Sequence, residues 1–187
     1  VEVYTNHANG GSSGIVSVSS GASEAEQTGN VILNTGLSNT ASSGSIRVKS
    51  GAASSQQSGS VSLNGGAGQT TGGSVHVVSG SSTTLSSGKV QIQTGESSSA
   101  GSGEVTMQSG STTEEQSGTT TISSGASSTS SSGDIQLVVS EGQSEGGSVH
   151  VSAGFSNVMT GGSVNTVTGS SASGHSGSIQ VESRASP

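Results

Sequence analysis

Cysteine is absent from this chain of 187 residues, aromatic residues make up 1% of it, and there is a single proline. Without cysteine the chain has no disulfide, no thiolate zinc site and no cysteine nucleophile. Sugar-binding sites favour aromatic platforms, and only Tyr4 and Phe155 could supply one. Glycan recognition by this segment is therefore not expected.

Positive charge is almost as scarce, with four basic residues against 11 acidic ones and a net charge of −7. Nucleic-acid binding requires a basic stripe that neutralises phosphates, and an anionic membrane surface attracts the same kind of stripe. Neither partner is expected. The longest apolar run, Leu137-Val138-Val139, is far shorter than a transmembrane span, so membrane insertion is not expected either.

Apolar residues are also few, at 26%, and charged residues make up only 8%. So little apolar surface normally indicates disorder, because its burial cannot offset the conformational entropy lost on folding. Disordered chains usually carry charge or proline as well, and this chain has little of either. Its apolar residues also keep a strict register, which favours an ordered chain over a disordered linker.

Glycine, in contrast, occurs 32 times and opens a motif that returns about every 15 residues. The motif reads glycine, a small or polar residue, Val/Ile, any residue, Val/Ile/Leu, any residue, Ser/Thr, glycine. Residues 44–51, 59–66 and 88–95 are clear copies. The opening glycines are Gly14, Gly29, Gly44, Gly59, Gly73, Gly88, Gly103, Gly118, Gly133, Gly147, Gly162 and Gly177.

Alternation of apolar and polar residues with a period of two predicts a half-buried strand, and a fixed period of this length predicts stacked coils. The sequence therefore predicts an all-β fold, a parallel β-solenoid (β-helix) of about 13 rungs of 15 residues. The cross-section is expected to be flattened and two-faced, with Val61 and Val75 stacked on neighbouring rungs. Glycine at both strand ends is expected to supply the permissive dihedrals of tight corners.

The second face of this solenoid carries only small residues, so the core is expected to be a thin layer of Val/Ile/Leu against Ser/Ala/Thr. Two residues past the closing glycines lie Ser23, Ser38, Ala53, Ser82, Ser97, Thr112, Ser127, Ser156 and Ser171. Hydroxyls buried there must find partners along the stack or on the backbone.

A longer period is superimposed on the short one, because residues 68–77 are echoed by residues 142–151, which lie 74 residues further on. This superrepeat of five rungs is read either as a periodic docking point or as passive duplication of a block. The segment 1–187 is interpreted as a single domain, part of a longer array or a unit that stacks end to end or laterally. Its serines are candidates for O-linked sugar.

No constellation of residues predicts catalysis, and the expected catalytic, cofactor-binding and metal-binding residues are none. His76 and His150 share one outward column but lie five rungs apart, too far to share a metal or a proton. Glu114 and Glu115 are read as solvated corner charges. A weak surface ion pair is expected between Lys89 and Glu104.

The repeated Gly-Ser-Val-x-Val-x-Ser-Gly copies resemble Ser/Gly-rich solenoid arrays of large secreted cell-surface and fibre proteins of algal or protist type. The resemblance covers nearly the whole chain and implies a shaft or filament role. The leading hypothesis is therefore a structural, non-catalytic rod or filament segment of an extracellular fibre, cell-surface appendage or matrix.

Two alternatives remain open at the level of sequence. Flat-sided solenoids with arrayed threonines resemble antifreeze proteins, and a column with Thr40, Thr84 and Thr129 is the candidate ice face, although Glu114 interrupts it. The segment is also read as the stalk of an adhesin whose binding head lies elsewhere.

Overall fold

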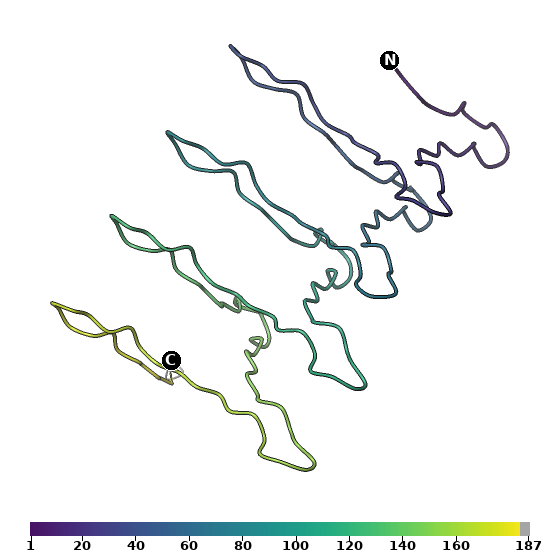
Figure 1. Ribbon diagram of the computed structural model, residues 1–187. Helices are drawn as coiled ribbons and strands as arrows, with labels where there is room; N and C mark the ends of the chain where they lie inside the picture. The colour runs from purple at the N-terminus through teal and green to yellow at the C-terminus, as the bar shows by residue number, and fades with distance from the viewer. Residues whose placement is uncertain (184–187) are drawn as a thin grey trace. The chain divides into compact units, whose positions relative to one another are not determined.

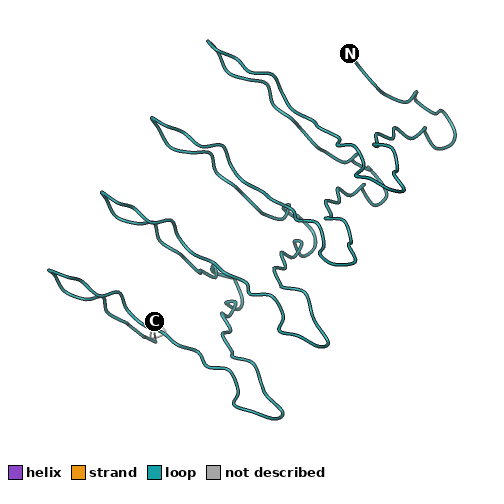
Figure 2. Cartoon of the chain, viewed as in Figure 1, coloured by secondary structure: helices purple, strands orange, loops and turns teal. Residues whose placement is uncertain are grey.

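The computed structural model describes residues 1–183, and over that range the backbone forms neither helices nor strands. Figure 2 shows the whole described chain as loop. The prediction of an all-β parallel solenoid, a β-helix of stacked rungs, is therefore wrong. Val61 and Val75, which were expected to stack on neighbouring strands, both lie in coil.

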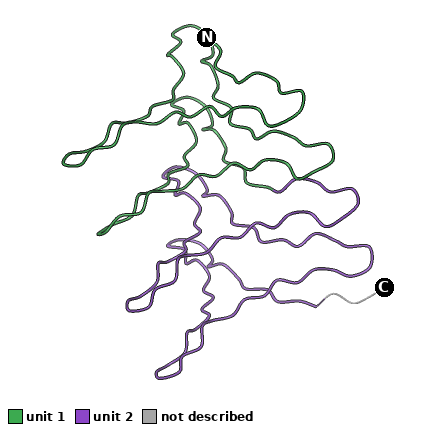
Figure 3. Cartoon of the chain, turned by 90° about the vertical axis from the view of Figure 1, so that its right-hand side faces the viewer, with its two compact units in different colours: residues 1–93 green, residues 94–187 purple. Residues whose placement is uncertain are grey.

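The structure divides into two compact units, Val1–Gln93 and Thr94–Pro187 (Figure 3). Within each unit the chain runs out and back in narrow loops whose two limbs lie side by side, as Figures 1 and 3 both show. The short bends of the chain recur with the 15-residue period of the sequence. We call the eight residues that begin at an opening glycine an arm, and the residues that join one arm to the next a loop. The last residue of most arms is the closing glycine, and in arm 133–140 it is Ser140.

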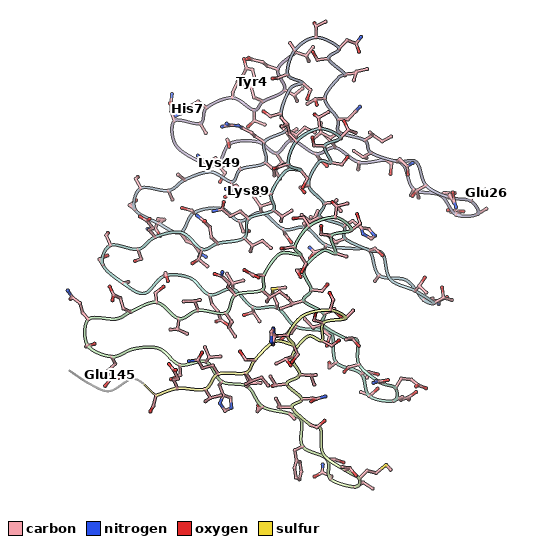
Figure 4. All side chains as sticks on the ribbon, turned by 90° about the vertical axis from the view of Figure 1, so that its left-hand side faces the viewer. Tyr4, His7, Glu26, Lys49, Lys89 and Glu145 are labelled. Atoms are coloured by element: carbon pink, nitrogen blue, oxygen red, sulfur yellow. The ribbon has the colours of Figure 1, made fainter. Side chains whose placement is uncertain are left out.

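Each loop contains a short bend, and the bends recur through both units with the period of the sequence. They lie at residues 9–11, 24–26, 39–41, 54–56, 69–70, 83–85, 98–100, 113–115, 128–130, 143–144, 157–159 and 172–174. Glu26, in one of these bends, lies at the tip of a narrow loop (Figure 4). The loops, which the sequence assigned to corners and a second face, carry the recurring bends of the chain.

The arms are extended, and side-chain hydrogen bonds between residues i and i+2 show it. Lys89 Nζ donates to Gln91 Oε1 at 2.8 Å, and Thr106 Oγ1 donates to Glu104 Oε1 at 2.6 Å. Asn64 Nδ2 donates to Ser62 Oγ at 2.7 Å. Side chains two residues apart meet only when the backbone is extended, because successive side chains then point to opposite sides. The alternation of the sequence thus gives each arm a polar and an apolar side. No strand pairs with the described arms.

No hydrophobic core forms among the described residues. The first apolar side chain of each arm stays about half exposed, from 48% at Ile46 to 60% at Val164. The second is more exposed still, as at Ile92 with 72%. The prediction of a thin core, with Val/Ile/Leu from one wall and Ser/Ala/Thr from the other, is therefore wrong.

The accessible surface measures how open the chain is. It amounts to 19015 Å². A compact monomer of 17.7 kDa exposes about 8,000 Å², and the fully extended chain about 26,000 Å². The surface lies nearer the extended value, because 26% apolar residues spread singly along the arms give the chain too little to bury.

The best-shielded side chains are small and hydroxylated. Only seven described residues are partly shielded from solvent, and all are serine or threonine: Thr5, Ser38, Ser50, Ser79, Thr94, Ser156 and Thr168. Five of these precede a closing glycine or its equivalent, and the other two, Ser38 and Ser156, immediately precede a bend. The contacts that organise the chain therefore lie where loops close.

Candidate functional site

The recurring site of this molecule is the place where each loop closes, which we call the neck. It joins the closing glycine of one arm, and the residue before it, to the opening glycine of the next arm. The amide of Gly88 donates to the carbonyl oxygen of Gly80 at 2.9 Å, and Gly177 donates in the same way to Gly169. In the described residues five backbone hydrogen bonds of this kind occur: Gly59 to Gly51, Gly73 to Gly66, Gly88 to Gly80, Gly162 to Gly154, and Gly177 to Gly169.

Space is tight at several of the opening glycines. A Cβ placed on Gly88 would lie 3.3 Å from Cβ of Ser79, and one on Gly59 would lie 3.4 Å from Cβ of Ser50. The same closeness recurs at Gly44 and Gly103, against the Cγ2 atoms of Thr35 and Thr94, at 3.4 Å. Small residues before the closing glycine and glycine after the loop therefore allow the two limbs to approach.

This reason differs from the one that the sequence suggested. Glycine was expected at the corners for its permissive dihedrals, yet in the described chain the only glycine with positive φ is Gly11, at 148°. The opening glycines adopt ordinary backbone conformations, and what they provide is the missing side chain.

The bend inside each loop is fixed by a hydroxyl. Ser82 Oγ accepts a hydrogen bond from the amide of Leu85 at 3.0 Å, and Ser127 Oγ accepts one from Ser130 at 3.0 Å. Serine and threonine hydroxyls commonly hold turns in this way, by bonding to the backbone a few residues on. The same bond is made by Ser23, Ser38, Ser82, Ser97, Thr112, Ser127, Ser156 and Ser171.

These are the residues that the sequence assigned to the second wall of the core. Ala53 is the member of that column without a hydroxyl, and there the backbone amide of Ala53 donates instead to Ser58 Oγ at 3.3 Å. The spacing of the column was informative, but its function is to hold a bend within one loop. A hydroxyl three residues before a bend amide was the signal that could have revealed this.

The two shorter loops, 67–72 and 141–146, replace the hydroxyl by glycine. In the first, the carbonyl oxygen of Thr71 occupies the space that a Cβ on Gly68 would need. In the second, the carbonyl oxygen of Glu145 does the same at Gly142. Deletion of one loop residue thus brings a carbonyl into the place of a side chain, and glycine at that position makes the tighter turn possible.

The ionisable residues that the sequence singled out lie on the surface and are not gathered into a site. His76 and His150 are exposed. Glu114 and Glu115 belong to the bend 113–115, where the amide of Glu115 donates to Thr112 Oγ1 at 3.3 Å. Lys89 and Glu104, expected to pair, bond to Gln91 and Thr106 within their own arms.

The residues considered for ice binding and for sugar binding lie on the surface. Thr40, Thr84 and Thr129 each occupy the middle position of a bend. Tyr4 and Phe155, the two aromatic residues, are 73% and 89% exposed.

Over residues 1–183 no pocket is present, and no group of three or more His, Asp or Glu side chains could hold a metal ion. Within the same range the chain contains no helix long and apolar enough to cross a membrane. The side chains project from the ribbon along the arms and loops (Figure 4).

Comparison with known proteins returned no match, whether to a family model, a curated protein or a solved structure.

Proposed function

We propose that this chain is a non-catalytic structural segment of an extracellular fibre, cell-surface appendage or matrix. The observation that carries the proposal is the repetition of one neck contact. A Cβ on the opening glycine would meet the residue before the previous closing glycine at Gly14, at Gly177, and at most opening glycines between them. A contact repeated along the sequence presents a series of equivalent arms, which suits a structural segment.

The surface chemistry supports the same function. Exposed serines and threonines with few charges are typical of matrix and surface proteins, and they offer many sites for O-linked sugar. The bend 128–130 and Ser127 before it present several hydroxyls, of which that of Ser127 holds the bend. The neighbouring hydroxyls of the bend are the proposed acceptor sites.

Localisation tests this proposal directly. An antibody raised against the peptide 125–133 would be applied to thin sections of the source cells and detected by immunogold labelling. The proposal predicts label on extracellular fibres, surface structures or matrix, and loss of label when the peptide competes. Label confined to the cell interior would contradict it.

A further inference from the structure

The arms combine extended backbone with side chains sorted to two sides. The residues one, three and five positions after the opening glycine form the polar side, as the bonds from Lys89 to Gln91 and from Gln91 to Gln93 show. The residues two and four positions after it form the apolar side and remain about half exposed or more, as at Val90 and Ile92. Within the described arms the backbone groups between the two glycines make no backbone hydrogen bond.

An extended segment with free N–H and C=O groups is a template onto which another extended segment can pair. Pairing would satisfy the backbone groups and cover part of the exposed apolar side chains at the same time. Arm 133–140, with four apolar residues among eight and no proline, has the composition that favours such association.

Charge on the polar side of the arms is divided between the two halves of the sequence. After Glu2, the charged arm residues of the first half are all basic, namely Arg47, Lys49 and Lys89. The charged arm residues of the second half, up to residue 183, are all acidic, namely Glu104, Asp134 and Glu182. All six stand at odd positions from their opening glycine, and therefore belong to the polar side.

We propose that the arms bind a second copy of this chain, with the basic arms 44–51 and 88–95 of one copy pairing edge to edge with the acidic arms 103–110 and 133–140 of the next. Opposite charges facing each other across a pair of extended segments stabilise it, and like charges oppose it. A contact between different halves of two copies leaves each copy with one free half, so assembly continues linearly instead of closing into a dimer. The inference rests on the proposed structural function and names the partner of the arms.

Sedimentation velocity and light scattering of the full chain, over a concentration series at low salt and at high salt, measure this association. We expect concentration-dependent growth at low salt and a marked loss of it at high salt, because exposed charges are screened. Growth with amide infrared absorption typical of paired strands supports edge-to-edge pairing. A chain that stays monomeric at every concentration and at both salt levels would overturn the inference.

Two charge-reversed variants give the sharper test. In the variant Lys49→Glu with Lys89→Glu, positions 49 and 89 become acidic, like positions 104 and 134. In the variant Glu104→Lys with Asp134→Lys, positions 104 and 134 become basic, like positions 49 and 89. Each variant alone should need at least a tenfold higher concentration to associate, and an equimolar mixture of the two should recover wild-type association. A mixture that associates no better than its components overturns the pairing of basic with acidic arms.

The matched control changes the net charge of the first half by the same amount but places the new charges in loops. It consists of Gln27→Glu, Gln56→Glu, Gln57→Glu and Gln69→Glu. This control should associate within about twofold of wild type. If it weakens association as much as the arm variants do, net charge alone explains the effect and the arms are not the binding surface.

The outcome is independent of the localisation experiment. Extracellular label together with a monomeric chain would retain the structural function and reject self-pairing of the arms. Association of the purified chain together with intracellular label would do the reverse.

Discussion

The amide of Gly88 donates to the carbonyl oxygen of Gly80 at 2.9 Å, and this bond closes the loop 81–87. Inside the loop, Ser82 accepts the amide of Leu85, and outside it Ser79 lies against Gly88. A backbone bond, a hydroxyl and a close contact thus act within one 15-residue repeat. Because all three are local, each can be tested by changing a single residue.

Substitution of Gly88 by alanine should open this neck. The new Cβ would lie 3.3 Å from Cβ of Ser79 and 3.5 Å from the backbone nitrogen of Gly80, so the two limbs are expected to move apart by a few tenths of an ångström, which weakens the bond between Gly88 and Gly80. A hydrogen bond contributes about 1 kcal/mol net, which corresponds to a roughly fivefold change in the ratio of closed to open neck. The exchange rate of the residue 88 amide, measured by NMR, should rise by about that factor.

The control for this substitution is Gly80→Ala, on the other side of the same neck. No atom lies within 4 Å of a Cβ placed on Gly80. The exchange rate of the Gly88 amide should therefore stay within about twofold of wild type, on the same scale of hydrogen-bond energies. Equal effects of the two substitutions would show that the close contact is not what requires glycine.

Removal of the hydroxyl of Ser82 should loosen one bend. In Ser82→Ala the amide of Leu85 loses its 3.0 Å acceptor and turns to water. Loss of a comparable hydroxyl cap at a helix end destabilises by about 1 kcal/mol, and an exposed bend should lose no more than that. Amide exchange at Leu85 should accelerate a few-fold, Ser82→Thr should restore it, and Ser81→Ala should leave it unchanged.

The shorter loops should tolerate no side chain where they turn most tightly. Gly68→Ala would place a Cβ against the carbonyl oxygen of Thr71, whereas Gly66→Ala meets no atom within 4 Å. We expect NMR chemical shifts to change across residues 66–73 in Gly68→Ala and only next to the substitution in Gly66→Ala. Similar, purely local changes in both variants would argue against the tight turn.

The sequence located the repeats but not their partners. The spacing that marks Gly59, Gly88 and Gly177 as repeat boundaries is the spacing of the necks. The alternation around Lys89 and Gln91 corresponds to the two sides of an extended arm. Both features are determined by residues close in sequence, so they can be recognised in a pattern.

Stacking of the repeats could not be inferred in the same way. The solenoid required Val61 and Val75 to lie on neighbouring rungs, and such pairing is stable only if it buries enough apolar surface to offset loop closure and chain entropy. Val61 stays 59% exposed and Val75 48%. Serines such as Ser82, assigned to the opposite wall, bond within their own loop instead. Periodicity alone does not distinguish these two uses of a hydroxyl.

Heating the dilute chain should produce no cooperative unfolding transition. The positive heat-capacity change of unfolding comes from exposure of buried apolar surface, and none of the described side chains is buried. Differential scanning calorimetry should therefore show a smooth trace. A packed domain of 187 residues would show a heat-capacity step of about 2.5 kcal/mol/K, and a step of that size would contradict the absence of a core.

Amide–water exchange measured residue by residue on the monomeric full chain tests the arrangement most directly. Order confined to the necks and bends predicts slowed exchange at the amides of Gly59, Gly88 and Gly177, and exchange at the rate of an unstructured peptide at Val61 and Val90 inside the arms. Strong protection at Val61 and Val90, with exchange slowed by orders of magnitude relative to the necks, would show that the arms are paired within one chain and would contradict the account.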